Sequence, residues 1–524
     1  MAEAVTTTEL GRLARGGALN LAGGVCKAAA GFALVLVVTR GLGVDGAGVF
    51  FEAVAAFMIL SNTAELGADT GLVRFVSGTL ALARGGELRG LLAVALWPVV
   101  LVGAVMAVGV FAAAGLLGET FTHGSGAGDV ATYLRTFAVF VPVAAVVTVL
   151  LAGTRGFGVS VPLVAVQEVG IPLLRLLLVA LVVAAGLGGA AVALGWALPL
   201  LLGLAPAAWA TRRLLVRAER RPAAPARPPR LVAREFWSFA APRGVAAFVQ
   251  ITILWVDVLL VGALAGARAA GVYAAASRAA IFGTLALEAV RVTIAPQISG
   301  LLASGERGTA QDVYQTATWW LVATSWPLYL TLALFPALAL SVFGPGFAEG
   351  AAALTILSLG MLVNLGTGNN TTVLLMGGRS SWALANSAAA LAANVVLNVA
   401  LIPRFGIAGA AFAWVVSIAV ENIAASLQLH RFMGLRPLGG GYGIVALSSV
   451  AAFGGLGLLA RTLVGPSLPL LALVVVVGCG LHTAVLWRYR ELLHLGALTA
   501  LVRRRAPNGA PASAAAVTRT GVSG

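Results

Sequence analysis

The chain consists largely of apolar segments of about 20 residues that are joined by short polar loops. A segment of this length is what an α-helix needs to cross the hydrocarbon core of a bilayer. Of the 524 residues, 60% are hydrophobic and only 10% are charged, whereas soluble proteins typically carry roughly 25% charged residues. The pattern therefore excludes a soluble globular class and predicts an all-α polytopic membrane protein.

The length criterion predicts about 14 transmembrane helices, with little chain left for a separate soluble domain. The expected spans are 18–39, 49–66, 91–114, 130–152, 161–184, 190–210, 237–264, 270–294, 318–343, 351–376, 382–402, 407–429, 442–463 and 468–487. The first of them is too long for the core of a signal peptide and lacks a convincing small-residue cleavage site. We therefore expect it to be retained as the first helix.

Arginines are concentrated in alternate loops between these spans. The loops expected to lie inside contain Arg74, Arg84, Arg89, Arg155, Arg307, Arg379, Arg431 and Arg436. The loops expected to lie outside contain one arginine or none. Because cytoplasmic loops carry an excess of Lys and Arg, this distribution predicts that both termini are cytoplasmic.

The segment 212–235 is the one obvious linker. Its arginines are Arg212, Arg213, Arg217, Arg220, Arg221, Arg227, Arg230 and Arg234, and they are interleaved with four prolines. In a soluble protein the net charge of +15 would suggest nucleic acid, but arginines between apolar spans are better explained as topological anchors. We therefore expect no nucleic-acid binding, and a solvated cytoplasmic connector that contacts anionic membrane lipids.

Two similar halves flank this linker. Gly48-Val-Phe-Phe recurs as Gly271-Val-Tyr-Ala, a shift of 223 residues, and the segment that begins at Gly186 recurs at Gly406, a shift of 220. Six spans precede the linker and six follow it, so both halves begin on the same side of the membrane. In such parallel repeats the substrate site lies where the two halves meet.

These boundaries predict five parts and two pseudo-symmetric lobes. The parts are an N-terminal six-helix lobe (1–211), the basic linker (212–235), a C-terminal six-helix lobe (236–430), two additional transmembrane helices (431–489) and a cytoplasmic tail (490–524). The tail is rich in Ala, Arg and Pro, and we expect it to be disordered.

Polar residues recur every seven positions in the first helix of each half. The seventh span carries Arg243, Gln250 and Asp257, and the first span carries Asn20 and Lys27. Seven residues turn a helix by about 700°, so residues at this spacing share one face. We expect these faces to line a common cavity, because lipid exposure of charged groups is costly. The alternative is that the residues only form hydrogen bonds between helices.

Arg278 lies in apolar surroundings in the eighth span. A charged side chain in this position normally faces a water-filled cavity. It needs a carboxylate from another helix, such as Asp257 or Glu65, or else an anionic ligand, and its spacing leaves both alternatives open. Glu288 and Arg291 are three residues apart and are expected to form a local ion pair.

Further polar side chains lie in other spans. The fifth span contains Gln167, Glu168 and Arg175, and the tenth and eleventh contain Asn364, Asn369, Asn370, Asn386, Asn394 and Asn398. These asparagines could contact sugar hydroxyls, but mutual hydrogen bonds between helices are the favoured interpretation. Asp257, Glu52, Glu65 and Glu421 are candidate sites for ion coupling or salt bridges.

No catalytic or metal-binding motif is found in the sequence. It lacks a Walker A motif, its four histidines are scattered, and Cys26 and Cys479 lie in apolar spans, where free thiols are expected. We therefore expect a protein that is not an enzyme and that needs no metal or cofactor.

Several junctions together resemble the polysaccharide biosynthesis exporters. They are 40–50, 234–242, 271–277, 354–360 and 374–379. These exporters are the oligosaccharide flippase branch, which includes O-antigen flippases, of the multidrug/oligosaccharidyl-lipid/polysaccharide transporter superfamily. The resemblance implies two six-helix lobes in a V shape in a bacterial cytoplasmic membrane. It also implies that an undecaprenyl-diphosphate-linked oligosaccharide is moved from the inner to the outer leaflet by alternating access.

The resemblance also bears on residues and partners. Lipid II flippases of the superfamily have a similar Ala-x-Arg in the eighth helix, where the arginine meets the diphosphate, and Ala276-Ser277-Arg278 matches it. Lys27 is the only cation within the first two spans, which departs from the pattern of those flippases. The implied substrate is a precursor of lipopolysaccharide or another surface polysaccharide, and the implied protein partners are a polymerase or glycosyltransferases. A lipid II flippase, a cation-coupled multidrug antiporter and a non-transporting scaffold are the alternatives.

Overall fold

The computed structural model describes residues 2–121, 127–220 and 227–493. Within these ranges the chain is almost entirely helical and contains no strand. The predicted tail falls almost wholly outside them. Nine helical segments of the described chain are long and apolar enough to cross a membrane, or ten when the bent pair Gly128–Ala138 and Val141–Gly156 is counted as one span. The all-helical, multi-pass prediction is therefore confirmed.

Two of these segments each contain two of the expected spans. The helix α1 (Ala2–Ala64) is broken at Gly43, where φ is 70°, and α16 (Ser380–Gln428) is broken at Gly406, where φ is 56°. Only glycine adopts this left-handed region readily, so each glycine lets one continuous helix turn back. The expected eighth and ninth spans correspond to α10 (Ala267–Phe282), α11 (Leu285–Ala303) and α12 (Arg307–Leu334), which are not among the nine segments.

The remaining helices follow in two groups. The first half contains α2 (Ala68–Ala81), the 3-10 turn η1 (Gly85–Glu87), α3 (Leu88–Phe121), α4 (Ala127–Ala138), α5 (Val141–Gly156), α6 (Val161–Leu163), the π-helix η2 (Val164–Gly170), α7 (Ile171–Ala184) and α8 (Gly189–Glu219). The second half contains α9 (Pro229–Ala265), α13 (Pro336–Ser341), the 3-10 turn η3 (Phe347–Gly350), α14 (Ala351–Gly366), α15 (Asn370–Met376) and the π-helix η4 (Leu429–Met433). After these come α17 (Tyr442–Ser449), the π-helix η5 (Val450–Gly455), α18 (Leu456–Val464) and α19 (Leu468–Arg488).

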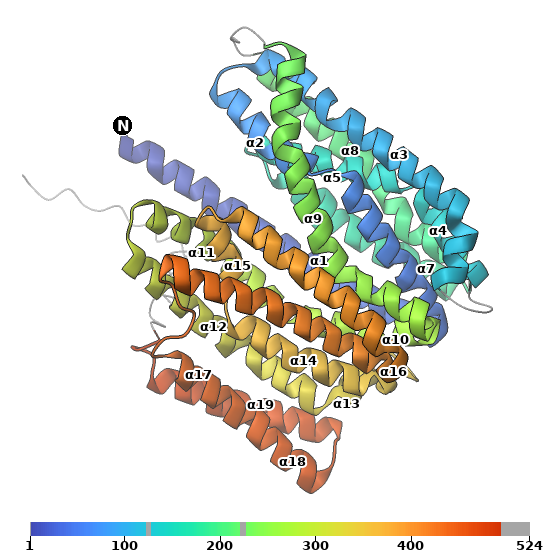
Figure 1. Ribbon diagram of the computed structural model, residues 1–524, viewed down its shortest axis with the longest axis vertical. Helices are drawn as coiled ribbons and strands as arrows, with labels where there is room; N and C mark the ends of the chain where they lie inside the picture. Colours follow the sequence, from blue (N-terminus) through green and yellow to red (C-terminus); the bar gives the residue numbers. More distant parts are fainter. Residues whose placement is uncertain (1, 122–126, 221–226, 494–524) are drawn as a thin grey trace, which may run out of the picture.

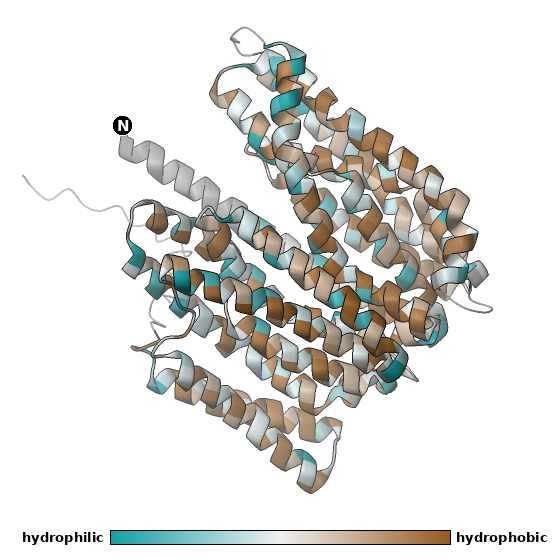
Figure 2. Ribbon diagram, in the orientation of Figure 1, coloured by the Kyte–Doolittle hydropathy of each residue, from teal (hydrophilic) through white to brown (hydrophobic). Residues whose placement is uncertain are grey.

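These helices form two bodies (Figure 1). Helices α2 to α8 pack together in one body and α10 to α16 in the other, while α1 and α9 each contact helices of both. Helices α17 to α19 lie along the outer edge of the second body. Hydrophobic residues predominate along most of the helices (Figure 2). Trp97 on α3, for example, is 73% exposed, as suits a surface that faces lipid.

The two bodies have the same backbone plan. Residues with positive φ occur in pairs at shifts of 220 to 223 residues, which agree with those found in the sequence: Gly43 with Gly266, Ala83 with Gly305, Gly158 with Gly378, and Gly186 with Gly406. The shift is 223 for the first pair and 220 for the last two, so the turns of the second half repeat those of the first. This agreement supports the pseudo-symmetry, while the five domain boundaries remain predictions.

Candidate functional site

A cavity of about 730 Å³ lies between the two bodies. Its walls come from both arms of α1, from α5, η2, α7 and α8 of the first half, and from α9 and α10 of the second. Most of the wall is apolar. The charged residues in it are Lys27, Glu65, Asp69, Arg155, Glu168, Arg175 and Arg278. The cavity is therefore a mixed site in which a few charges stand in apolar surroundings.

Arg278 lines this cavity from α10. Its guanidinium lies over the Trp255 ring, 3.8 Å from the ring centroid, and its Nε has no hydrogen-bond partner. Within the described chain it forms an ion pair with neither Asp257 nor Glu65. A cation over an aromatic face gains roughly 0.5–2 kcal/mol, which offsets only part of the cost of burying the charge. Of the two alternatives left open by the sequence, the structural salt bridge is not formed.

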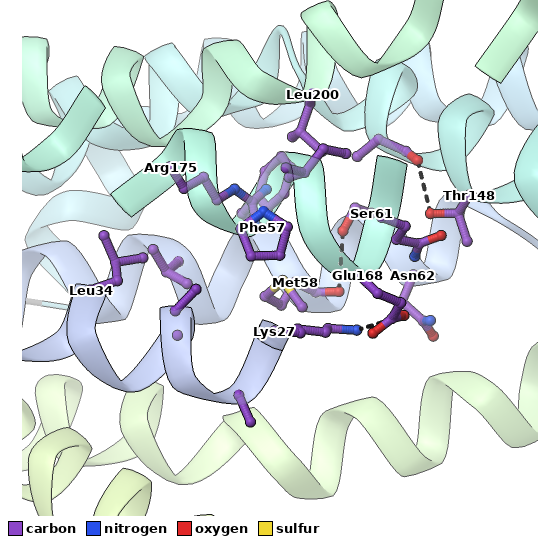
Figure 3. A pocket seen from close by; sticks show the side chains of 18 of the residues that line it. Lys27, Leu34, Phe57, Met58, Ser61, Asn62, Thr148, Glu168, Arg175 and Leu200 are labelled. Carbon is purple, nitrogen blue, oxygen red and sulfur yellow. Dashed lines mark hydrogen bonds and ion pairs between the residues drawn. The ribbon is translucent and has the colours of Figure 1, made fainter. Parts of the chain in front are cut away.

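Lys27 also lines the cavity, but it has a partner. Its Nζ lies 3.3 Å from Glu168 Oε1, and Figure 3 shows the pair. Glu168 is part of the π-helix η2, whose side chains Val164 and Glu168 would collide with a Cβ at Gly23. The glycine thus allows α1 to approach η2 closely enough for the pair to form.

Arg175 is a cavity residue that was not among the predicted cavity-lining residues. Its guanidinium lies over the Trp196 ring at 3.8 Å, and its Nε donates a hydrogen bond of 2.9 Å to the Trp196 carbonyl. No ion pair of Arg175 is found in the described part of the chain. The sequence did contain a signal for this position: Arg175 lies within an apolar span and has no acidic residue one helical turn away.

Arg243, Gln250 and Asn20 are exposed and are not among the residues that line the cavity. The cavity face of α9 is formed by Ile251 and Trp255. Each residue turns the helix by about 100°, so the stripe that runs through Arg243 and Gln250 points to another side of α9. The spacing correctly placed these residues on one face, but it does not determine which neighbour that face meets.

Asp257, on the same stripe, lies in a separate buried polar cluster. Its carboxylate accepts hydrogen bonds from Tyr273 Oη at 2.9 Å and from Asn398 Nδ2 at 2.8 Å. Asn398 also donates to the carbonyl and the side-chain oxygen of Asn394, which in turn donates to Ser417 Oγ. The Oδ1 atom of Asn398 is buried and accepts no hydrogen bond from the described part of the chain. Asp257 therefore faces α10 and α16 rather than the cavity.

The two candidate glutamates on α1 lie in different places. Glu65 lines the cavity together with Asp69, at the end where α1 meets α2. Glu52 is fully buried and is not among the cavity-lining residues. A Cβ at Gly262 of α9 would come within 2.4 Å of Glu52 Oε1, so Glu52 packs at the seam between α1 and α9.

Other predicted contacts can be compared directly with the structure. Glu288 and Arg291 form the expected pair at 2.5 Å, and Cys26 and Cys479 are free. Several asparagines satisfy polar groups of neighbouring helices: Asn386 with Gln428, Asn370 with Ser426, and Asn364 with Asn422. Ser387 donates to Glu421 in the same way. These contacts agree with the favoured interpretation of mutual hydrogen bonds.

The fold and this cavity define a multi-pass membrane protein that is built from two helical bodies with a cavity between them. Residues 13–299 match the sequence model of the family described as polysaccharide biosynthesis protein, and the chain belongs to this family. The resemblance seen in the sequence is thereby confirmed.

A curated relative is the probable low-salt glycan biosynthesis flippase Agl15 of Haloferax volcanii, which is 27% identical over 212 residues. The aligned region spans 39% of this chain and 43% of the relative, less than half of either.

Two solved structures share the fold. The lipid II flippase MurJ, in an inward closed conformation, superposes with a TM-score of 0.70 at 10% identity, covering 91% of this chain and 99% of MurJ. A multidrug resistance MATE family transporter of the MOP superfamily, in an inward-facing conformation, gives 0.63 at 14% identity, covering 78% and 94%. At such low identities these matches establish the fold.

Proposed function

We propose that this protein is a flippase that moves an undecaprenyl-diphosphate-linked oligosaccharide, a precursor of a cell-surface polysaccharide, from the inner to the outer leaflet by alternating access. The observation that carries the proposal is Arg278, which lies over Trp255 in the cavity between the two bodies and has no carboxylate partner among the described residues. A diphosphate would supply the missing charge-assisted hydrogen bonds.

The charge of the cavity favours this substrate over cationic drugs. Four basic and three acidic residues line it, and one acid, Glu168, is already paired with Lys27. The arginines Arg155, Arg175 and Arg278 lie on helices α5, α7 and α10, while Glu65 and Asp69 lie together near the α1–α2 junction. A multidrug antiporter for cations would need acids where these arginines stand. A lipid II flippase remains the alternative within the same substrate class.

The linker and the termini set the proposed orientation. We place 212–235 and both termini on the cytoplasmic side of a bacterial cytoplasmic membrane, in accordance with the excess of arginine there. The cavity would then receive its ligand from the inner leaflet. Lipid-linked oligosaccharide and anionic lipids are the proposed partners, together with a polymerase or glycosyltransferases of the same pathway.

Ion coupling is proposed for the buried cluster around Asp257. A carboxylate that is held by Tyr273 and Asn398, beside an amide oxygen without a partner, offers oxygen ligands to a small cation. The cluster lies between α9, α10 and α16, so a bound cation would change how these helices pack. Asp257→Asn is expected to remove any dependence of transport on a cation gradient.

The decisive experiment is deletion of the gene in its host, followed by localisation of lipid-linked glycans. We expect these glycans to accumulate on the cytoplasmic leaflet and the intact gene to restore export. A gene that carries Arg278→Ala should fail to restore export although the protein reaches the membrane. Export that is unchanged in the deletion strain, or fully restored by this variant, would refute the proposal.

A further inference from the structure

We infer that Arg175 of α7 and Arg278 of α10 form one anion site, with an arginine from each half, that selects a diphosphate over a monophosphate. The inference rests on the proposed function and specifies its substrate class. It assigns a binding role to Arg175, which the sequence analysis placed in the fifth span without a role in the cavity.

The register of the helices places Arg175 level with Leu34. Helices α1 and α7 run in parallel, because Lys27 pairs with Glu168 while a Cβ at Gly41 would collide with Val183. The offset between the two helices is therefore nearly constant along their length. Figure 3 shows Arg175 and Leu34 at one end of the view, away from the Lys27–Glu168 pair.

The position of Arg278 along the cavity can also be given relative to α1. Phe282 packs against Phe32 of α1, with the ring centroids 5.3 Å apart and the rings tilted by 49°. Helix α10 runs antiparallel to the first arm of α1, and Arg278 precedes Phe282 on it by four residues. Arg278 therefore lies about 6 Å beyond the level of Phe32 in the chain direction of α1, near position 36. Leu34 is only about 3 Å from that level. The two arginines therefore lie at nearly the same depth, on opposite sides of the cavity.

The surroundings of the two arginines are alike. Each guanidinium lies 3.8 Å from the centroid of a tryptophan ring, Trp196 for Arg175 and Trp255 for Arg278. Neither forms an ion pair within the described residues, whereas Lys27 is neutralised by Glu168. Trp255 is itself 8% exposed, and its Nε1 has no acceptor. The site therefore has two uncompensated cations and an unused N–H donor next to one of them.

A ligand with two linked phosphates matches this arrangement. Each guanidinium presents a planar fork of donors that fits the oxygens of one phosphate, and the apolar walls strengthen the interaction. A monophosphate can neutralise one arginine and leaves the other uncompensated. Because the arginines belong to different bodies, the diphosphate would also connect the two halves.

The test is a binding measurement on the full-length protein in nanodiscs of neutral lipid. Microscale thermophoresis would compare undecaprenyl diphosphate with undecaprenyl monophosphate for the wild type, Arg175→Gln and Arg278→Gln. We expect the wild type to prefer the diphosphate at least about tenfold, since charge-assisted hydrogen bonds are the strong ones. Each variant should lose about tenfold or more in diphosphate affinity and should bind the monophosphate almost unchanged.

Arg213→Gln is the matched control. Arg213 also lies over a tryptophan, Trp209, at 5.2 Å, but this pair is outside the cavity. Its removal should leave both affinities within about twofold. If Arg175→Gln does not fold, Arg175→Lys keeps the charge without the fork and should still reduce the preference.

The possible failures can be told apart. If Arg175→Gln and Arg175→Lys keep the full preference while Arg278→Ala abolishes export in the deletion strain, the two-arginine site is wrong and the flippase proposal stands. If the wild type binds neither carrier and no lipid-linked glycan accumulates in the deletion strain, both are wrong.

Discussion

Gly48 and Gly271 face each other with no room for a side chain on either. A Cβ at Gly48 would lie 1.8 Å from the Ala267 carbonyl oxygen, and a Cβ at Gly271 would lie 2.3 Å from that of Val44. The two glycines are also related by the 223-residue repeat, so equivalent positions of the two halves meet each other. The contact therefore lies on the pseudo-symmetry axis, where the backbones of α1 and α10 touch.

The first prediction concerns this contact. Gly48→Ala and Gly271→Ala should each destabilise the observed arrangement by about 1–3 kcal/mol, the usual cost of forcing atoms into a packed site. Thermal unfolding of the purified variants in detergent would measure it. Gly24→Ala is the control, because Gly24 has no atom within 4 Å of the added Cβ. Equal stability of all three variants would show that the backbones of α1 and α10 do not approach each other this closely at Gly48 and Gly271.

The repeat could be predicted from the sequence because glycines at turns are required by backbone geometry alone. Gly186 and Gly406 both have positive φ, as do Gly43 and Gly266. The meeting of Gly48 with Gly271 could not be predicted, since the sequence shows that two residues are equivalent but not that they touch. Contacts across a symmetry axis depend on how the two bodies are placed against each other.

A second relationship connects the linker to the first body. Arg227 binds Glu87 of η1 through its backbone N–H at 2.9 Å and through its side chain, with Nη2 at 3.1 Å from Oε2. It also reaches Glu235 of α9 at 2.7 Å. The side-chain hydrogen bond with Glu87 raises the pKa of Arg227, and this effect outweighs the opposing effect of burial. The guanidinium therefore stays charged at any physiological pH and links Glu235, near the start of α9, to Glu87 of η1.

We predict that Arg227→Ala destabilises the protein by about 1–3 kcal/mol, because the buried carboxylate of Glu87 loses its guanidinium partner and keeps only the backbone N–H of residue 227. The neighbouring Arg230→Ala removes an exposed arginine from the same region and should have almost no effect. Chemical denaturation followed by tryptophan fluorescence would compare the two. A similar loss in both variants would indicate a general effect of net charge, contrary to the proposed contact.

Lys27 and Glu168 offer a test of the charge of the cavity. Glu168→Gln frees Lys27 from its partner and makes the cavity more positive. We expect this variant to bind undecaprenyl diphosphate about two- to fivefold more tightly at low salt, the size expected of an exposed charge pair. The gain should shrink as salt screens the charge. The double exchange of Lys27→Glu with Glu168→Lys keeps the net charge and should return affinity toward that of the wild type.

The polar stripe of α9 shows what the sequence could not predict, namely the neighbour that a polar helix face contacts. Periodicity placed Arg243, Gln250 and Asp257 on one face, and their cost in lipid suggested a common cavity. The structure instead uses Ile251 and Trp255 on the cavity side. A helix that lies between two bodies can carry polar residues on more than one face. The spacing shows which residues share a face, but it does not show which neighbouring helix that face contacts. The position of Arg278 in the cavity wall was easier to foresee, because no acid on its own helix could reach it.

The last prediction separates the architectural role of the Asp257 cluster from its proposed role in coupling. Tyr273 is 1% exposed, and its hydroxyl donates a hydrogen bond to the Asp257 carboxylate, as does Asn398 Nδ2. Tyr273→Phe should therefore cost about 1–3 kcal/mol of stability, the penalty for an unsatisfied buried acceptor. Tyr489→Phe, at an exposed position, should cost almost nothing.

If the cluster also couples a cation to transport, added cation should stabilise the wild type more than Asp257→Asn, since only the carboxylate provides full negative charge. Thermal unfolding in sodium chloride and in the chloride of a bulky organic cation, at equal ionic strength, would measure this difference. Equal stabilisation of both proteins would leave Asp257 with a purely structural role. Tyr273→Phe should then still be destabilised, because the hydrogen bond that it loses does not depend on any ion.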